Sequence, residues 1–412
     1  MAGFIGKLIQ RKDRMPAFLR NTISYLVSNQ DGVLFRTVLR LTGQNRRPIP
    51  VPTEVPEAKT RVLIGPANYA GQGRQWARSL ELFHGVGAKN LMVSVPGGIL
   101  FSADTVVPFG VYHLSKEWQR AELQSVAQFT HVLVEAEKPL LGGLFKNDLS
   151  RESEALRQRG VRLAYITHGS DTRNPAQHSK LTPWSPFIDR TPEVEALQRL
   201  SDKNRALLRT LPGPKFVPTP ELLSDLPGAE WCPIVVEQER WQRASKPLFR
   251  HELPRVVHIP SKGWIKGTDL VEPIMDELHD KGLVEYSQVT GIPHSQMPNE
   301  IGNADIVLEQ FRLGIYATTA IEAMAAGRVV IGHVMSSVRE HVRKVSGMEL
   351  PIVEATPDTL RGVIIELIAD PQKCREIGEA GARFAELVHD GRLSAEVLTK
   401  HWINLPDSAD RA

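Results

Sequence analysis

Short apolar runs alternate with amphipathic runs along most of this chain. In the first half, each β-branched run predicts a strand, and apolar residues at a spacing of three to four predict the helix after it. The predicted strands are 61–65, 90–95, 131–135 and 162–167, and the predicted helices are 74–84, 116–129, 151–159 and 192–211, followed by the short run 215–218. Strands that alternate with helices predict a parallel, doubly wound sheet.

The same alternation starts again in the second half. The run 231–237 is predicted to be a strand that leads into a second domain, and the polar stretch 238–254 to be a connection. The predicted strands are then 255–260, 284–289, 305–308, 328–334 and 350–353, and the predicted helices are 268–281, 298–302, 317–326, 356–369, 371–389 and 393–404. The fold class is therefore α/β with two domains, an N-terminal one over residues 61–236 and a C-terminal one over residues 237–390.

Residues 1–60 form a separate basic extension, with ten Lys and Arg against four Asp and Glu in a chain whose net charge is +3. Residues 1–47 predict short amphipathic helices, and a Pro-rich linker follows. Such a leader suits peripheral contact with an anionic membrane. The alternative, helices that pack on the first domain, stays open.

Composition places the chain as a whole among ordinary soluble proteins, with 42% apolar and 24% charged residues. No run approaches the ~20 apolar residues of a membrane span, and the start lacks the features of a signal peptide. Two cysteines, Cys232 and Cys374, indicate a reducing compartment, so we expect a cytoplasmic location, with the inner face of the membrane as the peripheral variant. Nucleic acid is not an expected partner, because no aromatic residues interleave the basic ones.

The clearest candidate site follows the predicted strand 305–308. In a parallel sheet, ligands lie beyond the carboxyl ends of the strands and face helix N-termini, where free N–H groups suit a phosphate. A carboxylate in the first turns of the next helix can accept both hydroxyls of a ribose. The residues in this position are Glu309, Gln310, Gly314, Tyr316 and Glu322. They predict a nucleotide-diphosphate site, although Glu322 as a helix-favouring surface residue is an equal alternative.

Two further loops carry candidate chemistry. Lys262 and Lys266 flank a Gly-containing loop after a predicted strand, where two ammonium groups can neutralise a diphosphate; solvated surface lysines are the alternative. His168 ends a strand of the first domain and precedes Asp171 and Arg173. These three polar groups predict a loop over the ligand crevice, against the alternative of local backbone capping.

These residues resemble those of retaining glycosyltransferases of the GT-B type, close to family 4. Lys262 and Lys266 resemble the basic pair on the donor diphosphate, and Glu322 resembles the second Glu of the Glu-x7-Glu motif, which holds the ribose. A glycine loop, Gly71 and Gly73, resembles that of the N-terminal domain, although it is a weak match to a dinucleotide fingerprint. The resemblance implies two Rossmann-like domains that face each other across a cleft, with a C-terminal helix at 391–405 that crosses back to the first.

One position departs from the family pattern. Gly314 stands where the first Glu of the motif would bind the donor sugar, and Glu309, with Gln310 beside it, is the candidate replacement. The resemblance further implies that backbone N–H groups of Tyr316, Ala317 and Thr318 hold the diphosphate. It also implies that His168 lies near the donor sugar, and that Asp171 and Arg173 face the acceptor, as site residues of the N-terminal domain.

The implied activity is transfer of a sugar from a nucleotide-diphosphate sugar to a glycan, lipid or small-molecule acceptor. No cofactor is expected, and no metal, because the chain has no Asp-x-Asp motif. Three alternatives stay open: a sugar-nucleotide epimerase, a phosphorylase of the same fold, and a non-catalytic binding or scaffold protein with a degenerate donor site. The loops 97–114 and 172–190 are expected to set substrate identity.

Overall fold

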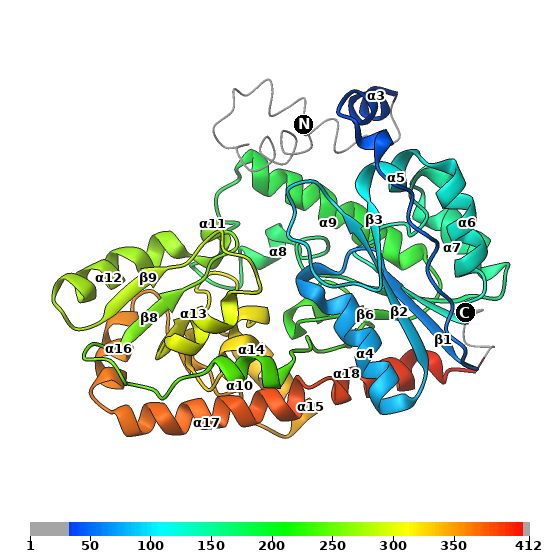
Figure 1. The fold of residues 1–412 in the computed structure, drawn as a ribbon. Coiled ribbons are helices and arrows are strands. Elements are labelled where there is room, and N and C mark those ends of the chain that lie inside the picture. Colours follow the sequence, from blue (N-terminus) through cyan, green and yellow to red (C-terminus); the bar gives the residue numbers. More distant parts are fainter. Residues whose placement is uncertain (1–32, 407–412) are drawn as a thin grey trace. The chain divides into compact units, whose positions relative to one another are not determined.

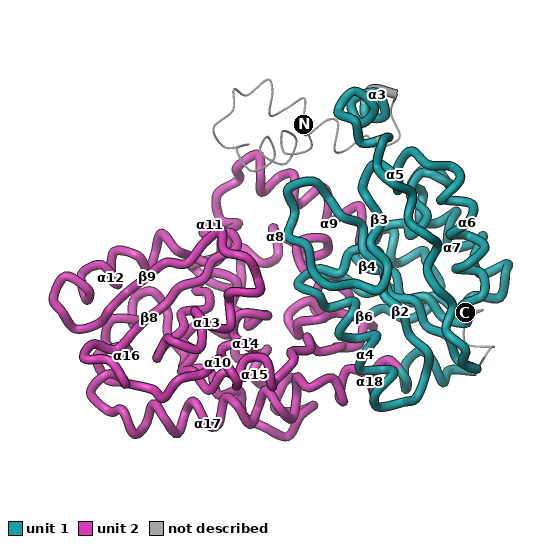
Figure 2. Tube along the Cα trace, viewed as in Figure 1, with its two compact units in different colours: residues 1–168, 207–216, 399–412 teal, residues 169–206, 217–398 magenta. Residues whose placement is uncertain are grey.

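A computed structural model of the chain describes residues 33–406, so the helices predicted within residues 1–32 lie outside the described part. By their internal contacts the described residues divide into two compact units (Figure 2). Unit 1 holds the chain up to His168, with Leu207–Phe216 and the residues from Thr399 on. Unit 2 holds Gly169–Ala206 and Val217–Leu398.

The first parallel sheet has seven strands in the order β3-β2-β1-β4-β5-β6-β7 (Figure 1). The strands are β1 Arg61–Gly65, β2 Gly87–Ser94, β3 Thr105–Pro108, β4 His131–Glu135, β5 Arg162–Ile166, β6 Lys215–Val217 and β7 Glu230–Trp231. Every pair from β3 to β6 is parallel. Apart from β7, this is the Rossmann strand order. Successive strands are added on one side of β1 up to β3 and on its other side from β4 on, so the topological switch point lies between β1 and β4.

Helices flank this sheet because their apolar faces match its buried strands. The helices of the first half are α3 Val33–Leu41, α4 Gln72–His84, α5 Phe109–Leu114, α6 Lys116–Val126, α7 Leu149–Arg157, α8 Pro175–His178 and α9 Pro192–Thr210. In α3, the Phe35 ring lies 6.1 Å from the ring of Phe109 and 5.1 Å from that of His113. Residues 33–41 therefore follow the alternative in which a helix of the N-terminal extension packs on the first domain.

The second sheet has five strands in the order β12-β11-β10-β8-β9, and all four pairs are parallel. Its strands are β8 Arg255–His258, β9 Glu285–Gln288, β10 Ile306–Leu308, β11 Val329–Gly332 and β12 Val353–Glu354. The helices of this half are α10 Gln238–Ala244, α11 Gly263–Lys266, α12 Thr268–Asp280, α13 Met297–Asn303, α14 Thr318–Ala325, α15 Ser336–Ser346, α16 Leu360–Ile368, α17 Pro371–Val388 and α18 Arg392–Leu398. The order reverses between β8 and β10, so the predicted fold class is confirmed as two parallel α/β sheets.

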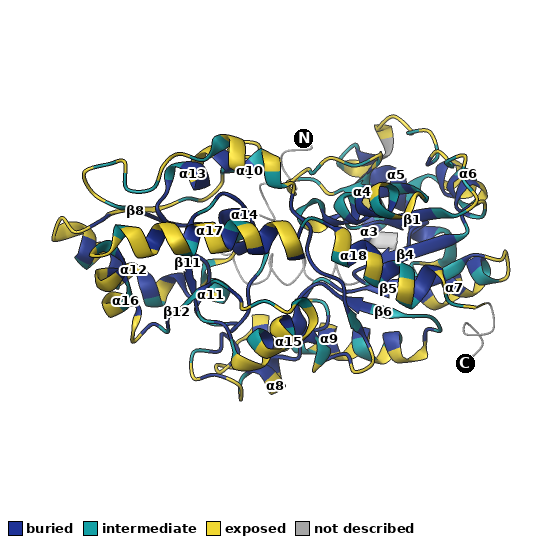
Figure 3. Cartoon of the chain, turned by 90° about the horizontal axis from the view of Figure 1, so that it is seen from below, coloured by how far each residue is buried: buried dark blue, intermediate teal, exposed yellow. Residues whose placement is uncertain are grey.

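Helix α14 lies at the centre of unit 2, and every residue from Ala320 to Ala325 is buried. Helix α17 covers it and shows buried and exposed stripes along its length (Figure 3). Two glycines of α17 allow this close approach: a Cβ on Gly378 would lie 2.4 Å from the carbonyl oxygen of Gly327, and one on Gly381 would lie 3.3 Å from Met324. The position of α14 is thus fixed by close packing on a second helix.

Four segments differ from the sequence-based expectation. Only Trp231 of the predicted strand 231–237 lies in a strand, β7, because Pro233 has no N–H and the N–H of Val236 donates to the carbonyl of His389 instead. The predicted connection 238–254 begins with helix α10, which buries Trp241. The loop 97–114 contains β3 and α5, and helix α15 was not predicted at all.

No helix of residues 33–406 is both long and apolar enough to cross a bilayer.

Candidate functional site

Lys266 and Glu309 meet where the strand order of the second sheet changes direction, between β8 and β10. Lys266 is the last residue of α11, the short helix after β8, and Glu309 follows β10 directly. The Lys266 Nζ atom lies 3.2 Å from Glu309 Oε2 and 3.3 Å from the hydroxyl of Thr319, on α14. The backbone fixes this arrangement, because the N–H of Phe311 donates to the carbonyl of Lys266 at 2.9 Å. Two predicted site residues therefore meet at the edge where open α/β sheets bind ligands.

Glu309 is almost completely buried, with 1% of its surface exposed. Its Oε2 atom accepts from Lys266, whereas its buried Oε1 atom has no hydrogen-bond partner among the described residues. A buried carboxylate oxygen without a partner is costly. A polar ligand that donates a hydrogen bond to Oε1 would remove that cost.

The N-terminus of α14 has no side-chain cap. The first N–H groups of a helix have no intrahelical partner, and Ala317, the residue before this helix, has no side chain that could accept from them. Tyr316 contributes only its backbone here, because its ring is buried in the core and its hydroxyl lies 3.3 Å from Nε2 of His389. The charge of the Lys266 ammonium and the dipoles of these N–H groups are of the kind that attracts an anion beside α14.

Glu322 lies one turn further along α14 and is 7% exposed. Its Oε1 atom is 2.9 Å from Nε2 of His294, and the guanidinium of Arg240 donates to the carbonyl of His294 at 2.8 Å. Burial raises the pKa of Glu322; the hydrogen bond and charge of His294 and the charge of Arg240 act in the opposite direction, and Glu309 adds to the rise. The alternative of Glu322 as a surface residue is wrong, because its carboxylate is buried.

Gln310 and Gly314 shape the loop between β10 and α14. The Gln310 side chain donates to the carbonyl of Ile315 at 2.5 Å and accepts from the N–H of Leu313 at 2.7 Å. Gly314 has a φ of 66°, and a Cβ there would lie 2.5 Å from the side chain of Met335. The absence of a carboxylate at position 314 thus has a physical reason, because any larger residue would strain this turn.

Lys262 and His258 complete the loop after β8. Lys262 is exposed and precedes α11. His258 donates from Nδ1 to the carbonyl of Leu308 at 2.9 Å, so its Nε2 accepts from the hydroxyl of Thr268, also at 2.9 Å. The ring therefore ties β8 to β10 and to the start of α12. Within residues 33–406, no group of three or more His, Cys, Asp or Glu is placed to hold a metal ion.

In unit 1 the glycine loop surrounds a carboxylate of its own chain. Glu135, fully buried at the end of β4, accepts from the N–H groups of Ala67 and Asn68 at 3.1 and 2.9 Å. Gly73, in the first turn of α4, leaves room for it, because a Cβ there would lie 2.9 Å from Glu135 Oε2 and 2.6 Å from the amide nitrogen of Asn90. Gly71 precedes α4 with a φ of 74°. Gly73 thus packs against Glu135, and Gly71 shapes the turn before the helix.

His168 joins the same cluster, whereas Asp171 and Arg173 belong to unit 2. The Nε2 atom of His168 lies 3.2 Å from Glu135 Oε1. Arg173 is buried and donates to Glu221 at 2.5 Å, so its guanidinium is part of an internal ion pair. Asp171 is half-buried. His168 therefore has Glu135 as a carboxylate neighbour, a residue that the sequence analysis did not single out.

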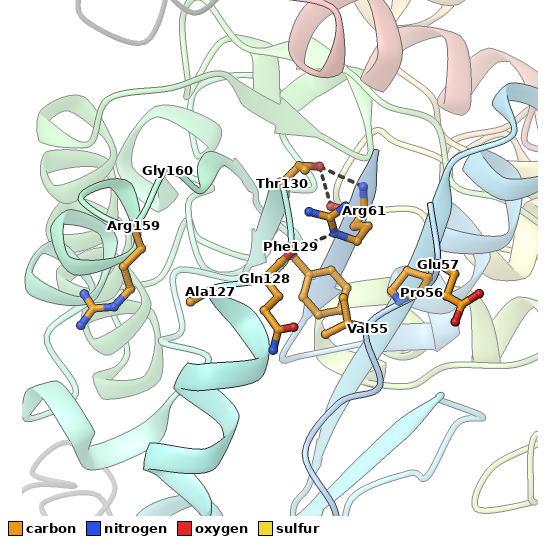
Figure 4. A pocket seen from close by; sticks show the side chains of 10 residues that line it. All are labelled: Val55, Pro56, Glu57, Arg61, Ala127, Gln128, Phe129, Thr130, Arg159 and Gly160. Atoms are coloured by element: carbon orange, nitrogen blue, oxygen red, sulfur yellow. Dashed lines mark hydrogen bonds between the residues drawn. The ribbon is translucent and has the colours of Figure 1, made fainter. Parts of the chain in front are cut away.

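A surface pocket of about 530 Å³ lies at the opposite edge of the first sheet (Figure 4). Arg61 and Thr130, at the amino ends of β1 and β4, line it together with the linker residues Val55 and Pro56. The Arg61 guanidinium already donates to backbone carbonyls, including that of Gln128 at 2.7 Å. Because the amino ends of the strands are far from the ligand edge of a parallel sheet, we place the candidate site at the carboxyl ends instead.

Sequence reasoning missed three residues of these clusters: Glu135, His294 and Thr319. Glu135 is the last residue of a predicted strand, and this position at the carboxyl end of a strand could have identified it as a candidate site residue. His294 lies in a loop without a pattern and reaches Glu322 across 28 residues of sequence. Thr319 lies within the predicted helix 317–326, but no role was predicted for it.

Comparison with solved structures identifies the fold. A glycosyltransferase from Rickettsia africae ESF-5 matches with a TM-score of 0.52 and 9% identity, over 82% of this chain and 96% of that one. The sucrose-phosphate synthase of Thermosynechococcus elongatus matches with a TM-score of 0.49 and 13% identity, over 82% and 97%. HepE of Anabaena, solved with UDP and glucose, gives 0.48 and 11%, over 84% and 99%.

No protein-family profile matches this sequence, and no curated protein matches it either. The match to the Rickettsia africae structure and the two Rossmann-like α/β sheets show that the chain has the GT-B fold of glycosyltransferases. At 9% identity, this likeness concerns the fold alone.

The close packing of Gly73 gives a first prediction. Gly73→Ala is expected to destabilise the protein by about 1–3 kcal/mol, because the added methyl group overlaps Glu135 and Asn90. Gly362→Ala is the matched control: it lies in helix α16 with no atom within 4 Å of a new Cβ, so it is expected to stabilise by about 0.5–1 kcal/mol. Urea unfolding of both variants measures the difference. Equal effects of the two substitutions would contradict this packing.

Three buried histidines of unit 2 predict acid sensitivity. Burial lowers the pKa of His178, His258 and His389 to about 4. Each stays neutral in the folded protein while the unfolded chain takes up a proton near pH 6.5, so stability is full above pH 6.5 and falls toward pH 4, by about 3 kcal/mol per histidine. Unfolding titrations at pH 7, 5.5 and 4.5 measure this slope. His258→Asn should reduce the slope of stability against pH by the amount that corresponds to about one proton taken up on unfolding. A stability that does not change with pH would contradict the prediction.

Proposed function

We propose that this chain is a glycosyltransferase that moves a sugar from a nucleotide-diphosphate sugar to an acceptor, with retention of configuration and without a metal. The observation that carries the proposal is the cluster in unit 2: Lys266 and Glu309 meet beside the open N-terminus of α14, and Glu322 lies buried on the same helix. The GT-B fold supports the same conclusion.

The roles follow from the charges of the cluster. The diphosphate would lie against the N–H groups at Ala317 and Thr318, with Lys266 on its oxygens and Lys262 approaching from the exposed side. The two hydroxyls of the ribose would donate to Glu322. Glu309, whose Oε1 atom is buried and without a partner, would accept from a hydroxyl of the donor sugar and so replace the carboxylate that Gly314 cannot provide.

The chemistry is the cleavage of one C–O bond and the formation of another. The bond from C1 of the sugar to the diphosphate breaks, and the nucleoside diphosphate leaves with the electron pair. A hydroxyl oxygen of the acceptor bonds to C1, and its proton passes to the diphosphate. Because negative charge grows on the leaving group, preorganised donors at Lys266 and α14 would stabilise the transition state more than the ground state.

A non-catalytic nucleotide-sugar-binding protein is the second candidate. Two observations favour it: Gly314 cannot carry the family's carboxylate without strain, and Lys266 is already paired with Glu309. This candidate predicts binding at the same cluster without turnover.

Incubation of the purified chain with a panel of nucleotide sugars separates the two candidates. Release of nucleoside diphosphate that persists in a metal chelator supports the proposal. Binding without release, across glycan, lipid and small-molecule acceptors, supports the second candidate, and loss of release in the chelator contradicts the metal-independent mechanism.

The domain boundaries at 61–236 and 237–390 and the membrane contact of residues 1–47 stay predictions. Sedimentation with anionic vesicles, with and without residues 1–47, tests the membrane contact. Equal sedimentation of the two forms would contradict it.

A further inference from the structure

The carboxyl group of Glu322 is held by a histidine from a distant part of the same unit. His294 lies in the loop between β9 and α13, and its Nε2 atom is 2.9 Å from Glu322 Oε1. The side chain of His294 is 28% exposed, whereas that of Glu322 is 9% exposed. A buried carboxyl group on α14 thus meets an imidazole that reaches the surface.

Helix α10 fixes the position of His294. Arg240 donates to the backbone carbonyl of His294 at 2.8 Å, and the ring of Trp241 lies 6.0 Å from the imidazole at an angle of 67°. Trp241 is buried in the core of unit 2, so its ring is held in place by close packing. The hydroxyl of Ser245, directly after α10, donates to the carbonyl of Ala326, directly after α14, at 2.6 Å. The support of His294 is therefore tied to α14, the helix on which the contact is made.

The contact decides which oxygen of Glu322 can face a ligand. His294 engages Oε1, whereas Oε2 has no hydrogen-bond partner among residues 33–406. The contact forms whichever of the two groups carries the proton, because an imidazole can donate to a carboxylate or accept from a carboxylic acid. An oxygen without a proton can accept two hydrogen bonds, so Oε2 alone can receive both hydroxyls of a ribose.

The charges around Glu322 explain why such a support is useful. Burial raises the pKa of Glu322 and the charge of Glu309 adds to the rise, while the hydrogen bond and charge of His294 and the charge of Arg240 act in the opposite direction. Two acidic side chains in one site repel each other when both are ionised. His294 and Arg240 therefore offset part of the cost of keeping an acceptor at this position.

We propose that His294 is a positioning residue for ribose recognition: its contact with Oε1 holds the Glu322 side chain so that Oε2 meets the ribose hydroxyls of a nucleoside diphosphate. This role rests on the proposed function, whereas the contact itself does not. A side chain that is ordered before the ligand arrives loses less conformational entropy on binding. Loss of His294 therefore changes the recognition of the ribose and not the chemical step.

Calorimetry of the full chain with ADP, GDP and UDP, each beside its 2′-deoxy form, tests the role. His294→Ala is expected to weaken the binding of the ribose form by about five- to tenfold, the net contribution of one hydrogen bond, and that of the 2′-deoxy form by less. His294→Gln keeps a hydrogen-bonding group at this position and should recover part of the preference. His84→Ala, at an exposed histidine that ends α4, is the matched control and should keep the preference of the wild type. In donor turnover, His294→Ala should raise KM and leave kcat within about twofold, the pattern of a contact that is equal in the ground and transition states.

Urea unfolding without a ligand tests the contact on its own. His294→Ala, Glu322→Ala and the double variant form a cycle, and the double variant should shift the unfolding midpoint by less than the sum of the two single shifts, because either substitution already removes the same hydrogen bond. Additive shifts would overturn the proposal. An unchanged ribose preference in His294→Ala, or an equal loss for both nucleotide forms, would overturn it too while the nucleotide site stands. If the wild type binds none of the nucleoside diphosphates, the proposed function fails and the positioning role fails with it, even where the shifts are not additive.

Discussion

Replacing Lys266 with methionine is expected to lower the kcat for donor turnover by about 100- to 1,000-fold, the usual effect of removing one preorganised donor to developing negative charge. The ammonium of Lys266 lies 3.3 Å from the hydroxyl of Thr319, beside the start of α14, where the leaving diphosphate would gain charge. Steady-state release of nucleoside diphosphate measures the loss.

The same substitution also affects stability, so the two effects need separation. Lys266→Met leaves the buried Glu309 unpaired, at a cost of about 3 kcal/mol. The double variant Lys266→Met with Glu309→Gln should recover most of that stability and none of the activity. Lys344→Met, an exposed lysine on α15, is the matched control with stability within about 0.5 kcal/mol and unchanged turnover. Full activity of the stabilised double variant would refute the role of Lys266.

The second large effect is expected at Glu322. Glu322→Gln should weaken the binding of a nucleoside diphosphate by about 10- to 100-fold, because hydrogen bonds to a charged partner contribute about 1.5–3 kcal/mol. The carboxylate is 7% exposed and lies on the helix that would receive the diphosphate. Since burial raises the pKa of Glu322 and the ionised form is the better acceptor, binding by the wild type should weaken as the pH falls through that pKa.

Calorimetry with ribose and 2′-deoxyribose forms of the same nucleoside diphosphate isolates this contact. The wild type should prefer the ribose form, and Glu322→Gln should lose most of that preference. Glu349→Gln, an exposed carboxylate in the same unit, should keep it. If both variants discriminate as well as the wild type, Glu322 does not contact the ribose.

The sequence predicted those parts of the site that depend on local pattern. Lys266 and Glu309 each follow a short β-branched strand, and residues at such positions share one edge of a parallel sheet. Both residues were therefore expected at strand ends on the ligand side of the sheet, and the structure brings Lys266 Nζ and Glu309 Oε2 within 3.2 Å. The Ala-rich run after Gly314 likewise predicted α14 to within a few residues.

Pairings over long sequence separation could not be predicted in this way. Glu135 meets His168 across 33 residues, and His294 meets Glu322 across 28, and no periodicity records such contacts. The turn at Gly314 shows the same limit, because its need for a glycine comes from its φ of 66° and from Met335, which follows the next strand. Helix α15 was missed because its polar surface dominates its sequence, with Val338 and Val342 as its buried residues.

A crystal structure of the chain with a bound nucleoside diphosphate tests the central claim most directly. We expect phosphate oxygens within hydrogen-bond distance of Lys266 Nζ and of the N–H groups at the start of α14, with both ribose hydroxyls on the carboxylate of Glu322. A diphosphate bound elsewhere, or a ribose away from Glu322, would contradict it.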